Sequence, residues 1–186
     1  MKKFLAIFLI IIAANVSTAS AAMLPVAEVG VNEFVKSMAE IVYSEDFQKE
    51  KPLLITNAVK IENKDLPEIG EYSWACQYGL KTSSQPEGEI IFFVDGAEKV
   101  SALKIVCYSE QYAENAGVLF AVITQALGIR QADAEFLLNN LNDDEILSSS
   151  VVWSEERQRC FVLMAGARAQ AAEGFQLMLM ASDKQN

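Results

Sequence analysis

The sequence predicts an α+β fold in which helices pack on antiparallel β-meanders. Two apolar hairpins, residues 89–109 and 160–182, each consist of a polar turn between two apolar runs. Segments with the 3.6-residue apolar periodicity of amphipathic helices come before each of them along the chain. We expect residues 23–186 to form a single α+β domain, because about 165 residues suit one hydrophobic core.

Residues 1–22 have the features of a secretory signal peptide. Lys2 and Lys3 precede the apolar run Phe4–Val16, and small residues follow up to Ala22. The apolar run is shorter than the stretch of about 20 residues that a permanent membrane anchor needs. We therefore expect an exported protein, periplasmic or extracellular, with no stable membrane span after signal cleavage.

The first half of the domain, residues 31–109, begins with a predicted helix over residues 31–42. Its apolar face consists of Val31, Phe34, Val35, Met38, Ile41 and Val42. Strands are predicted over residues 53–61 and 71–81, followed by the first apolar hairpin. Asp95-Gly96 predicts a tight turn in this hairpin, because glycine accepts the positive φ that such turns require.

The strand predicted over residues 71–81 alternates between two kinds of side chain. One face carries Tyr72, Trp74, Cys76, Tyr78 and Leu80, and the other carries Ser73, Ala75, Gln77 and Gly79. We expect the aromatic face to be buried and the small, polar face to be in water. Tyr72, Trp74 and Tyr78 are candidate ligand-facing aromatics, although an aromatic stripe on a strand more often belongs to the core.

The second half, residues 110–182, begins with two predicted helices. The first covers residues 110–128 and ends at Gly128, and the second covers residues 130–142. Inward-facing residues of the second helix are Phe136, Leu137, Leu138 and Leu141. Strands follow over residues 146–153, 159–166 and 174–182. Both halves thus place a helix before a meander, which is the pattern of a duplicated unit.

Several of the predicted strands are apolar at successive positions. This holds for IIFFV at residues 90–94, CFVLM at 160–164 and LMLM at 177–180. A strand with one face in water would alternate instead. We therefore expect the second face of the sheet to be covered, by the other half of the chain, by a second copy or by a partner.

Composition excludes several classes of function. The chain has 15 basic and 25 acidic residues, a net charge of −10, and no histidine. An acidic chain without a cluster of lysines and arginines is not expected to bind nucleic acid. The absence of histidine excludes Ser-His-Asp and Cys-His catalysis within this chain. No motif for a cofactor or a metal is present, and we expect neither.

Three cysteines are present: Cys76, Cys107 and Cys160. An odd number allows at most one disulfide within the chain. The first interpretation is that all three are buried and inert thiols. The other is one structural disulfide, for which Cys107–Cys160 is the favoured pair, because it would join the two apolar hairpins.

These patterns favour a non-enzymatic, exported module of the cell envelope that binds or assembles with another molecule. The partner is expected to be a protein, either a second copy of the chain or an envelope protein, and a small ligand is the other option. A hydrolase that uses only carboxylates is an alternative. A further alternative is a secreted inhibitor or effector that binds a foreign protein.

Overall fold

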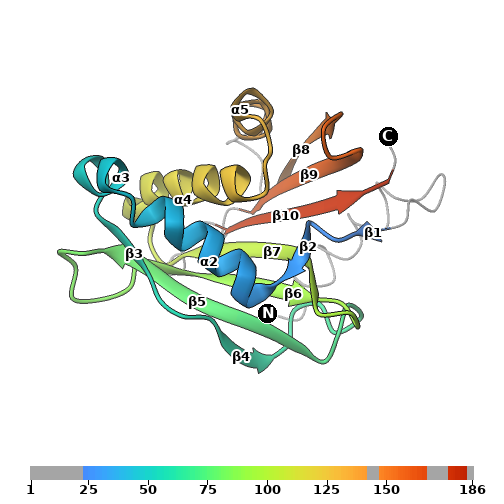
Figure 1. Ribbon diagram of the computed structural model, residues 1–186, viewed down its shortest axis with the longest axis horizontal. Coiled ribbons are helices and arrows are strands. Elements are labelled where there is room, and N and C mark those ends of the chain that lie inside the picture. The colour runs from blue at the N-terminus through green and yellow to red at the C-terminus, as the bar shows by residue number, and fades with distance from the viewer. Residues whose placement is uncertain (1–22, 142–146, 167–175, 184–186) are drawn as a thin grey trace.

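The computed structural model describes residues 23–141, 147–166 and 176–183, which form one antiparallel sheet with helices packed on it (Figure 1). The helices are α2 (Val31–Val42), α3 (Glu45–Glu50), α4 (Ala113–Ala126) and α5 (Gln131–Asn139). The strands are β1 (Met23–Leu24), β2 (Ala27–Gly30), β3 (Leu53–Ile55), β4 (Val59–Glu62), β5 (Tyr72–Leu80), β6 (Gly88–Val94), β7 (Lys99–Cys107), β8 (Leu147–Ser154), β9 (Arg159–Gly166) and β10 (Gln176–Ser182). The predicted α+β class is confirmed.

The two meanders meet at the pairing of β7 with β10. The strand order is β3-β5-β6-β7-β10-β9-β8, so the last strand of each meander lies at the centre of the sheet. Val106 lies opposite Gln176 and Ala102 lies opposite Met180 across this seam. The two halves of the chain therefore lie side by side, and the strands of one half extend the sheet of the other without covering its second face.

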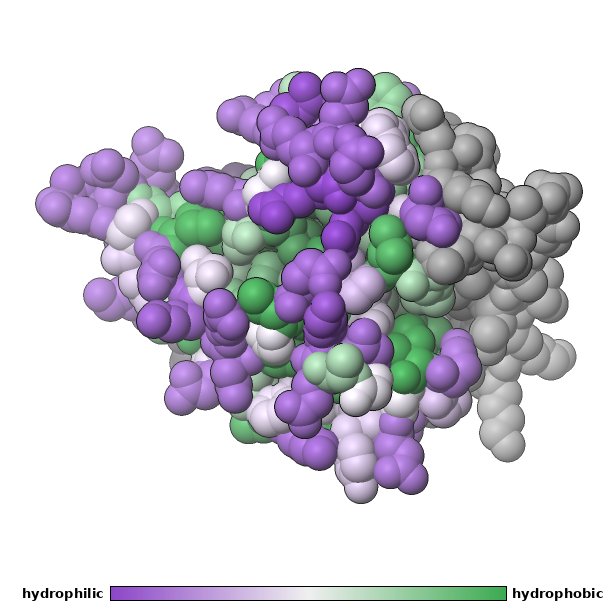
Figure 2. All heavy atoms as spheres, turned by 45° about the vertical axis from the view of Figure 1, so that its right-hand side comes forward, coloured by the Kyte–Doolittle hydropathy of each residue, from purple (hydrophilic) through white to green (hydrophobic). Residues whose placement is uncertain are grey.

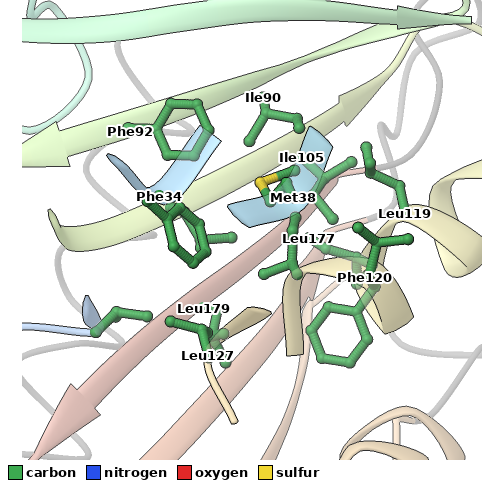
Figure 3. Packing of buried hydrophobic residues seen from close by; sticks show 14 of the residues in the cluster. Phe34, Met38, Ile90, Phe92, Ile105, Leu119, Phe120, Leu127, Leu177 and Leu179 are labelled. Atoms are coloured by element: carbon green, nitrogen blue, oxygen red, sulfur yellow. The ribbon is translucent and has the colours of Figure 1, made fainter. Parts of the chain in front are cut away.

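The main core lies between the sheet and the helices α2 and α4. Phe34 and Met38 of α2 and Leu119 and Phe120 of α4 are fully buried against the sheet (Figure 3). Their partners on β6, β7 and β10 include Ile90, Phe92, Ile105, Leu177 and Leu179. The rings of Phe34 and Phe92 meet edge to face, with 6.0 Å between their centroids. Each such side chain contributes about 1.5–3 kcal/mol by leaving water.

The opposite face of the sheet is also apolar, as the successive apolar positions predict. Its buried residues on the strands are Ile91, Phe93, Ala102, Val106, Met164, Met178 and Met180. Among the described residues, Leu66 and Ile69 are the side chains that reach this cluster from outside the strands. They belong to the loop between β4 and β5, so part of the cover over the second face is local to the first half.

Asn63 holds this loop in place. Its Nδ2 donates to the carbonyl oxygens of Leu66 at 2.6 Å and Gly70 at 2.7 Å. Its Oδ1 accepts a hydrogen bond from the Leu66 amide at 3.0 Å. The buried amide thus satisfies backbone groups that a loop without ladder pairing would leave unpaired.

The single strand predicted over residues 53–61 is two short strands, β3 and β4. Both pair with β5, but their registers differ: Ile55 lies opposite Tyr78, and Val59 lies opposite Ala75. The four residue steps from Ile55 to Val59 thus lie opposite three residue steps along β5. The extra residue interrupts the strand. The alternating sequence of this segment gave no indication of the interruption.

The short helix α3 lies in the polar segment between α2 and β3, for which the sequence predicts no helix. Ser44 caps it by accepting a hydrogen bond from the Phe47 amide at 3.4 Å. Glu45 and Asp46 occupy its first turn, where carboxylates favour the positive end of the helix dipole. Ser44, Glu45 and Asp46 are the residues from which the start of this helix could have been predicted.

The turn between β6 and β7 is at its predicted place, but its geometry differs from the prediction. It spans residues 95–98, and the positive φ of 61° belongs to Glu98 and not to Gly96. The Asp95 carboxylate accepts hydrogen bonds from the amides of Ala97 at 2.8 Å and Lys99 at 3.0 Å. The aspartate side chain therefore organises this turn.

Helix α4 ends at Ala126, two residues before the predicted stop at Gly128, whose φ is +67°. The Gly128 amide donates to the Gln125 carbonyl and the Ile129 amide donates to the Thr124 carbonyl, both at 2.9 Å. This pair of bonds is the Schellman motif, which favours glycine at the left-handed position. In the following helix, Phe136 was predicted to face inward, but it is 49% exposed.

The beginning of the described chain is tied to both halves of the sheet through Glu28. Its carboxylate accepts from Lys99 on β7 at 2.6 Å and from Arg159 on β9 at 2.8 Å. Arg159 also donates to the carbonyl oxygen of Pro25. The hydrogen bond from Lys99, followed by that from Arg159, lowers the pKa of Glu28.

Hydrophilic side chains cover most of the face shown in Figure 2, with apolar areas between them. No described helix is long and apolar enough to cross a membrane. The predicted signal peptide, residues 1–22, lies outside the described residues and remains a prediction.

We predict that Glu28→Gln lowers the free energy of unfolding near pH 7 by less than about 1 kcal/mol, because the Glu28 side chain is 53% exposed. A carboxyl group with a lowered folded-state pKa stabilises the fold above its ordinary pKa, and this stabilisation is lost as the pH falls. The difference between the two proteins should therefore shrink as the pH falls toward about 3. Urea unfolding at several pH values measures it, with the exposed Glu68→Gln as control. A difference that does not change with pH would contradict the assignment.

Candidate functional site

Strand β8 forms one edge of the sheet. Among the described residues it pairs only with β9, in a continuous register from Leu147 opposite Gly166 to Ser154 opposite Arg159. The backbone amide and carbonyl groups on its outer side therefore have no strand partner in the described part of the chain. Such groups can pair with a further strand.

The two edges of the sheet differ in length and in charge. The edge formed by β3 and β4 consists of strands of three and four residues, and Lys60 and Glu62 lie on β4. Strand β8 has eight residues, LSSSVVWS, with no charge, proline or glycine. Proteins usually keep an edge strand from pairing with another chain by making it short or by placing charges on it. Strand β8 is long and uncharged.

Side chains along β8 alternate between the two faces of the sheet. Ser150 lies opposite Leu163, which belongs to the core beneath the helices, whereas Val151 lies opposite Val162 at the second apolar cluster. Val151 is 40% exposed. Helix α5, which packs on β8, carries the exposed Phe136. The edge strand and the helix that packs on it thus each carry an exposed apolar side chain.

Ser150 on β8 has a buried hydroxyl group that makes no hydrogen bond with the described residues. It is only 3% exposed, and its Oγ has no hydrogen-bond partner among the described residues. A buried hydroxyl without a partner costs about 1–3 kcal/mol. Native structures contain few such groups, so each needs an explanation.

A concave feature lies on the sheet face away from the helices. It is a cavity of about 300 Å³ between the segment 61–65 and strands β5, β6 and β7. Its charged lining residues are Glu62, Lys64, Asp65, Glu89 and Lys104. Lys104 pairs with Asp65 at 2.8 Å, and Lys64 pairs with Glu62 at 3.3 Å. Two of its three carboxylates therefore already have lysine partners.

The candidate ligand-facing aromatics do not line this cavity. Tyr78 is buried under the helices, and burial is the main cause that raises its pKa. Trp74 is half-buried against the same core. Tyr72 is 47% exposed, and the Lys60 ammonium lies 4.1 Å from the centre of its ring. The structure thus places the three residues in three different environments along β5.

The cavity lies instead on the face of β5 that was expected to be in water. Ser73 lines it and is 1% exposed, and Ala75 on the same face is 8% exposed. The expectation that this face is solvated is therefore wrong for these two residues. The loop that Asn63 holds covers this side of the sheet, and the alternation along β5 carried no signal of that cover.

The three cysteines are buried free thiols, and the possible Cys107–Cys160 disulfide is not formed. Cys107 belongs to the core under the helices, whereas Cys160 lies next to Phe161 along β9 and so on the opposite face. Cys160 also lies opposite Ser182, at the far end of β10 from Gln176, which pairs beside Cys107. The two thiols are therefore separated along the strands, across the strands and by face.

The environment of the thiols makes them unreactive. Burial, followed by the nearby Glu89 carboxylate, raises the pKa of Cys76 to about 12. Burial also raises the pKa of Cys160. The Cys107 thiol donates to the carbonyl oxygen of Ser109 at 3.0 Å. Because the thiolate is the nucleophile, these surroundings do not support catalysis by cysteine.

We predict that the native protein does not react with a thiol probe such as 5,5′-dithiobis-(2-nitrobenzoate) near pH 8, and that all three thiols react after unfolding in urea. The burial of all three thiols and the raised pKa values of Cys76 and Cys160 are the physical reason. The absorbance of the released thiolate measures the reaction. Rapid reaction of one thiol in the folded state, or fewer than three after unfolding without reductant, would contradict this account.

No group of three or more histidine, cysteine, aspartate or glutamate side chains in the described ranges is arranged to hold a metal ion. A scan against models of protein families gave no match, and a search of curated protein sequences gave no significant match.

Proposed function

We propose that this chain is an exported, non-enzymatic module of the cell envelope that binds a protein along the outer edge of β8. The observation that carries the proposal is an uncharged edge strand of eight residues, LSSSVVWS, whose only strand partner in the described part of the chain is β9. The strand carries the exposed Val151, and helix α5, which packs on it, carries the exposed Phe136. Binding here adds a strand to the sheet.

Strand addition uses interactions that this edge offers. The outward amide and carbonyl groups of an edge strand such as β8 supply backbone hydrogen bonds, and alternate side chains supply specificity. Most of the surface of this acidic chain repels another acidic protein, since the net charge is −10. A neutral strand is the part of the sheet edge where a partner can approach without meeting that charge.

Export and the absence of enzymatic activity are further parts of the proposal. Residues 1–22 have the sequence of a signal peptide, and the chain contains no histidine. The raised pKa values of Cys76 and Cys160 speak against a cysteine nucleophile. Buried thiols that form no disulfide with one another are also compatible with an oxidising compartment.

A carboxylate-only hydrolase is the second candidate, and the cavity on the second face is the observation that favours it. Glu62, Asp65 and Glu89 line the same hollow. Such hydrolases need two acids that face each other across a substrate. Asp65 is instead paired with Lys104, and Glu62 with Lys64, which makes strand binding the better-supported proposal.

Site-specific crosslinking tests the proposed function. A photoreactive amino acid replaces Val151 in the full-length chain, which is expressed and exported in its own cells. Val59 is the matched control, because it is also an exposed valine on an edge strand, at the opposite end of the sheet. We expect a protein adduct, to a second copy or to another envelope protein, from position 151 and none from position 59. Equal labelling at both positions, or none at 151, would overturn the proposal.

A further inference from the structure

We propose that the cavity on the second face of the sheet binds a small organic ammonium compound, namely a primary amine that carries one apolar group. The ammonium group binds the carboxylate of Glu89, and the apolar group packs on the floor that β6 and β7 form. The cavity contains no residue of β8 in its lining, so this inference goes beyond the proposed function and does not rest on it.

The floor of the cavity is formed by alternate side chains of β6 and by their neighbours on β7. Glu89, Ile91 and Phe93 occupy alternate positions of β6 and therefore face the same side of the sheet, where all three line the cavity. Val106 of β7 lies opposite Glu89 and lines the cavity too. The half-buried Glu89 thus lies at one end of an apolar floor.

The wall of the cavity, residues 61–65, is held in place by two sets of bonds. Asn63 is 5% exposed, and its side chain makes three hydrogen bonds to the backbone of the loop that follows. Lys104 in the floor donates to Asp65 in the wall at 2.8 Å, and the Lys104 side chain is only 17% exposed. Because floor and wall are joined in this way, binding requires little ordering of the protein.

The charge of the lining favours a cation. The described lining contains three carboxylates, of Glu62, Asp65 and Glu89, and two lysines, so its net charge is −1. Lys64 pairs with Glu62 at 3.3 Å, and Lys104 pairs with Asp65. Both lysines of the lining therefore have other partners, and Glu89 is the carboxylate that neither of them neutralises.

Tyr108 adds a second feature that suits a cation beside Glu89. Burial, followed by the charge of the nearby Glu89 carboxylate, raises the pKa of Tyr108. A neutral phenol leaves the negative charge of its neighbour in place, and the Tyr108 side chain is 37% exposed. Since an exposed aromatic ring attracts ammonium groups, the carboxylate and the ring favour the same kind of ligand.

The size and the two-part lining of the cavity select among the possible ligands. A volume of about 300 Å³ is at the lower end of the range for small-molecule sites. An inorganic cation would leave the apolar floor unused, and a neutral apolar molecule would cover the Glu89 carboxylate without pairing it. An anion would be repelled by Glu89 and by a chain of net charge −10. A primary amine with one apolar group matches both parts of the lining.

Titration of the purified, exported protein with phenethylamine near pH 7 tests the site, with the backbone amide signals followed by NMR. We expect saturable binding in the millimolar range or tighter, with the largest shifts in residues 61–65, 89–93 and 104–106. Phenethyl alcohol lacks the charge and ethylamine lacks the ring, so each should bind at least about fivefold more weakly. Equal binding of the alcohol and the amine, or the absence of saturable binding of phenethylamine at these residues, would overturn the inference.

Two glutamine variants test the role of Glu89. Glu89→Gln should weaken the binding of phenethylamine about tenfold and leave that of phenethyl alcohol unchanged, because it removes a charge and keeps the shape of the side chain. Glu68→Gln is the matched control, since it removes the same charge from an exposed position of the neighbouring loop, outside the lining. It should leave the binding of phenethylamine unchanged. Equal effects of the two variants would show that the amine responds only to overall charge and would refute the site.

This proposal and the proposed function fail separately. The comparison of phenethylamine with phenethyl alcohol uses the wild-type protein, so it decides the amine site even where a variant does not fold. A negative titration refutes the amine site and has no bearing on the crosslink at Val151, which lies outside the lining of the cavity.

Discussion

The hydrogen-bonded pairing of β7 with β10 is the interaction on which the rest of the structure depends. It joins two three-stranded meanders, β5–β7 and β8–β10, into one sheet with β7 and β10 at its centre. The helices α2 and α4 contact each other over the same face, so the joined sheet and the helix pair enclose a common core. Glu28 adds an ionic link between the halves through Lys99 and Arg159.

Joining the meanders at their last strands leaves their first strands at the outside. In the first half, β5 is covered by the short strands β3 and β4, which interrupt that edge and carry charge. The described residues of the second half contain no equivalent strands beyond β8. The same topology that centres the core therefore leaves β8 at an edge, where β9 is its only strand partner in the described part of the chain, and the proposed function follows from this asymmetry.

The sequence predicted the elements better than it predicted their environment. Helix α2 has its predicted bounds, residues 31–42, and Gly128 ends α4, because a periodic apolar face and a left-handed glycine are local signals. Strand β8 was also predicted, but its position at an edge depends on the long-range pairing of β7 with β10. For the same reason Cys107 and Cys160 could not be placed on opposite faces, and the exposure of Phe136 could not be foreseen.

Hydrogen exchange of the backbone amides, followed residue by residue in dilute solution, tests most directly whether the β7–β10 seam unites the fold. Amides bonded across this seam, such as those of residues 102–106 and 176–180, should exchange slowest and at a common rate set by global unfolding. The outward amides of β8 should exchange much faster. If the two meanders instead exchange as independent units, with seam amides among the fastest, the account is wrong.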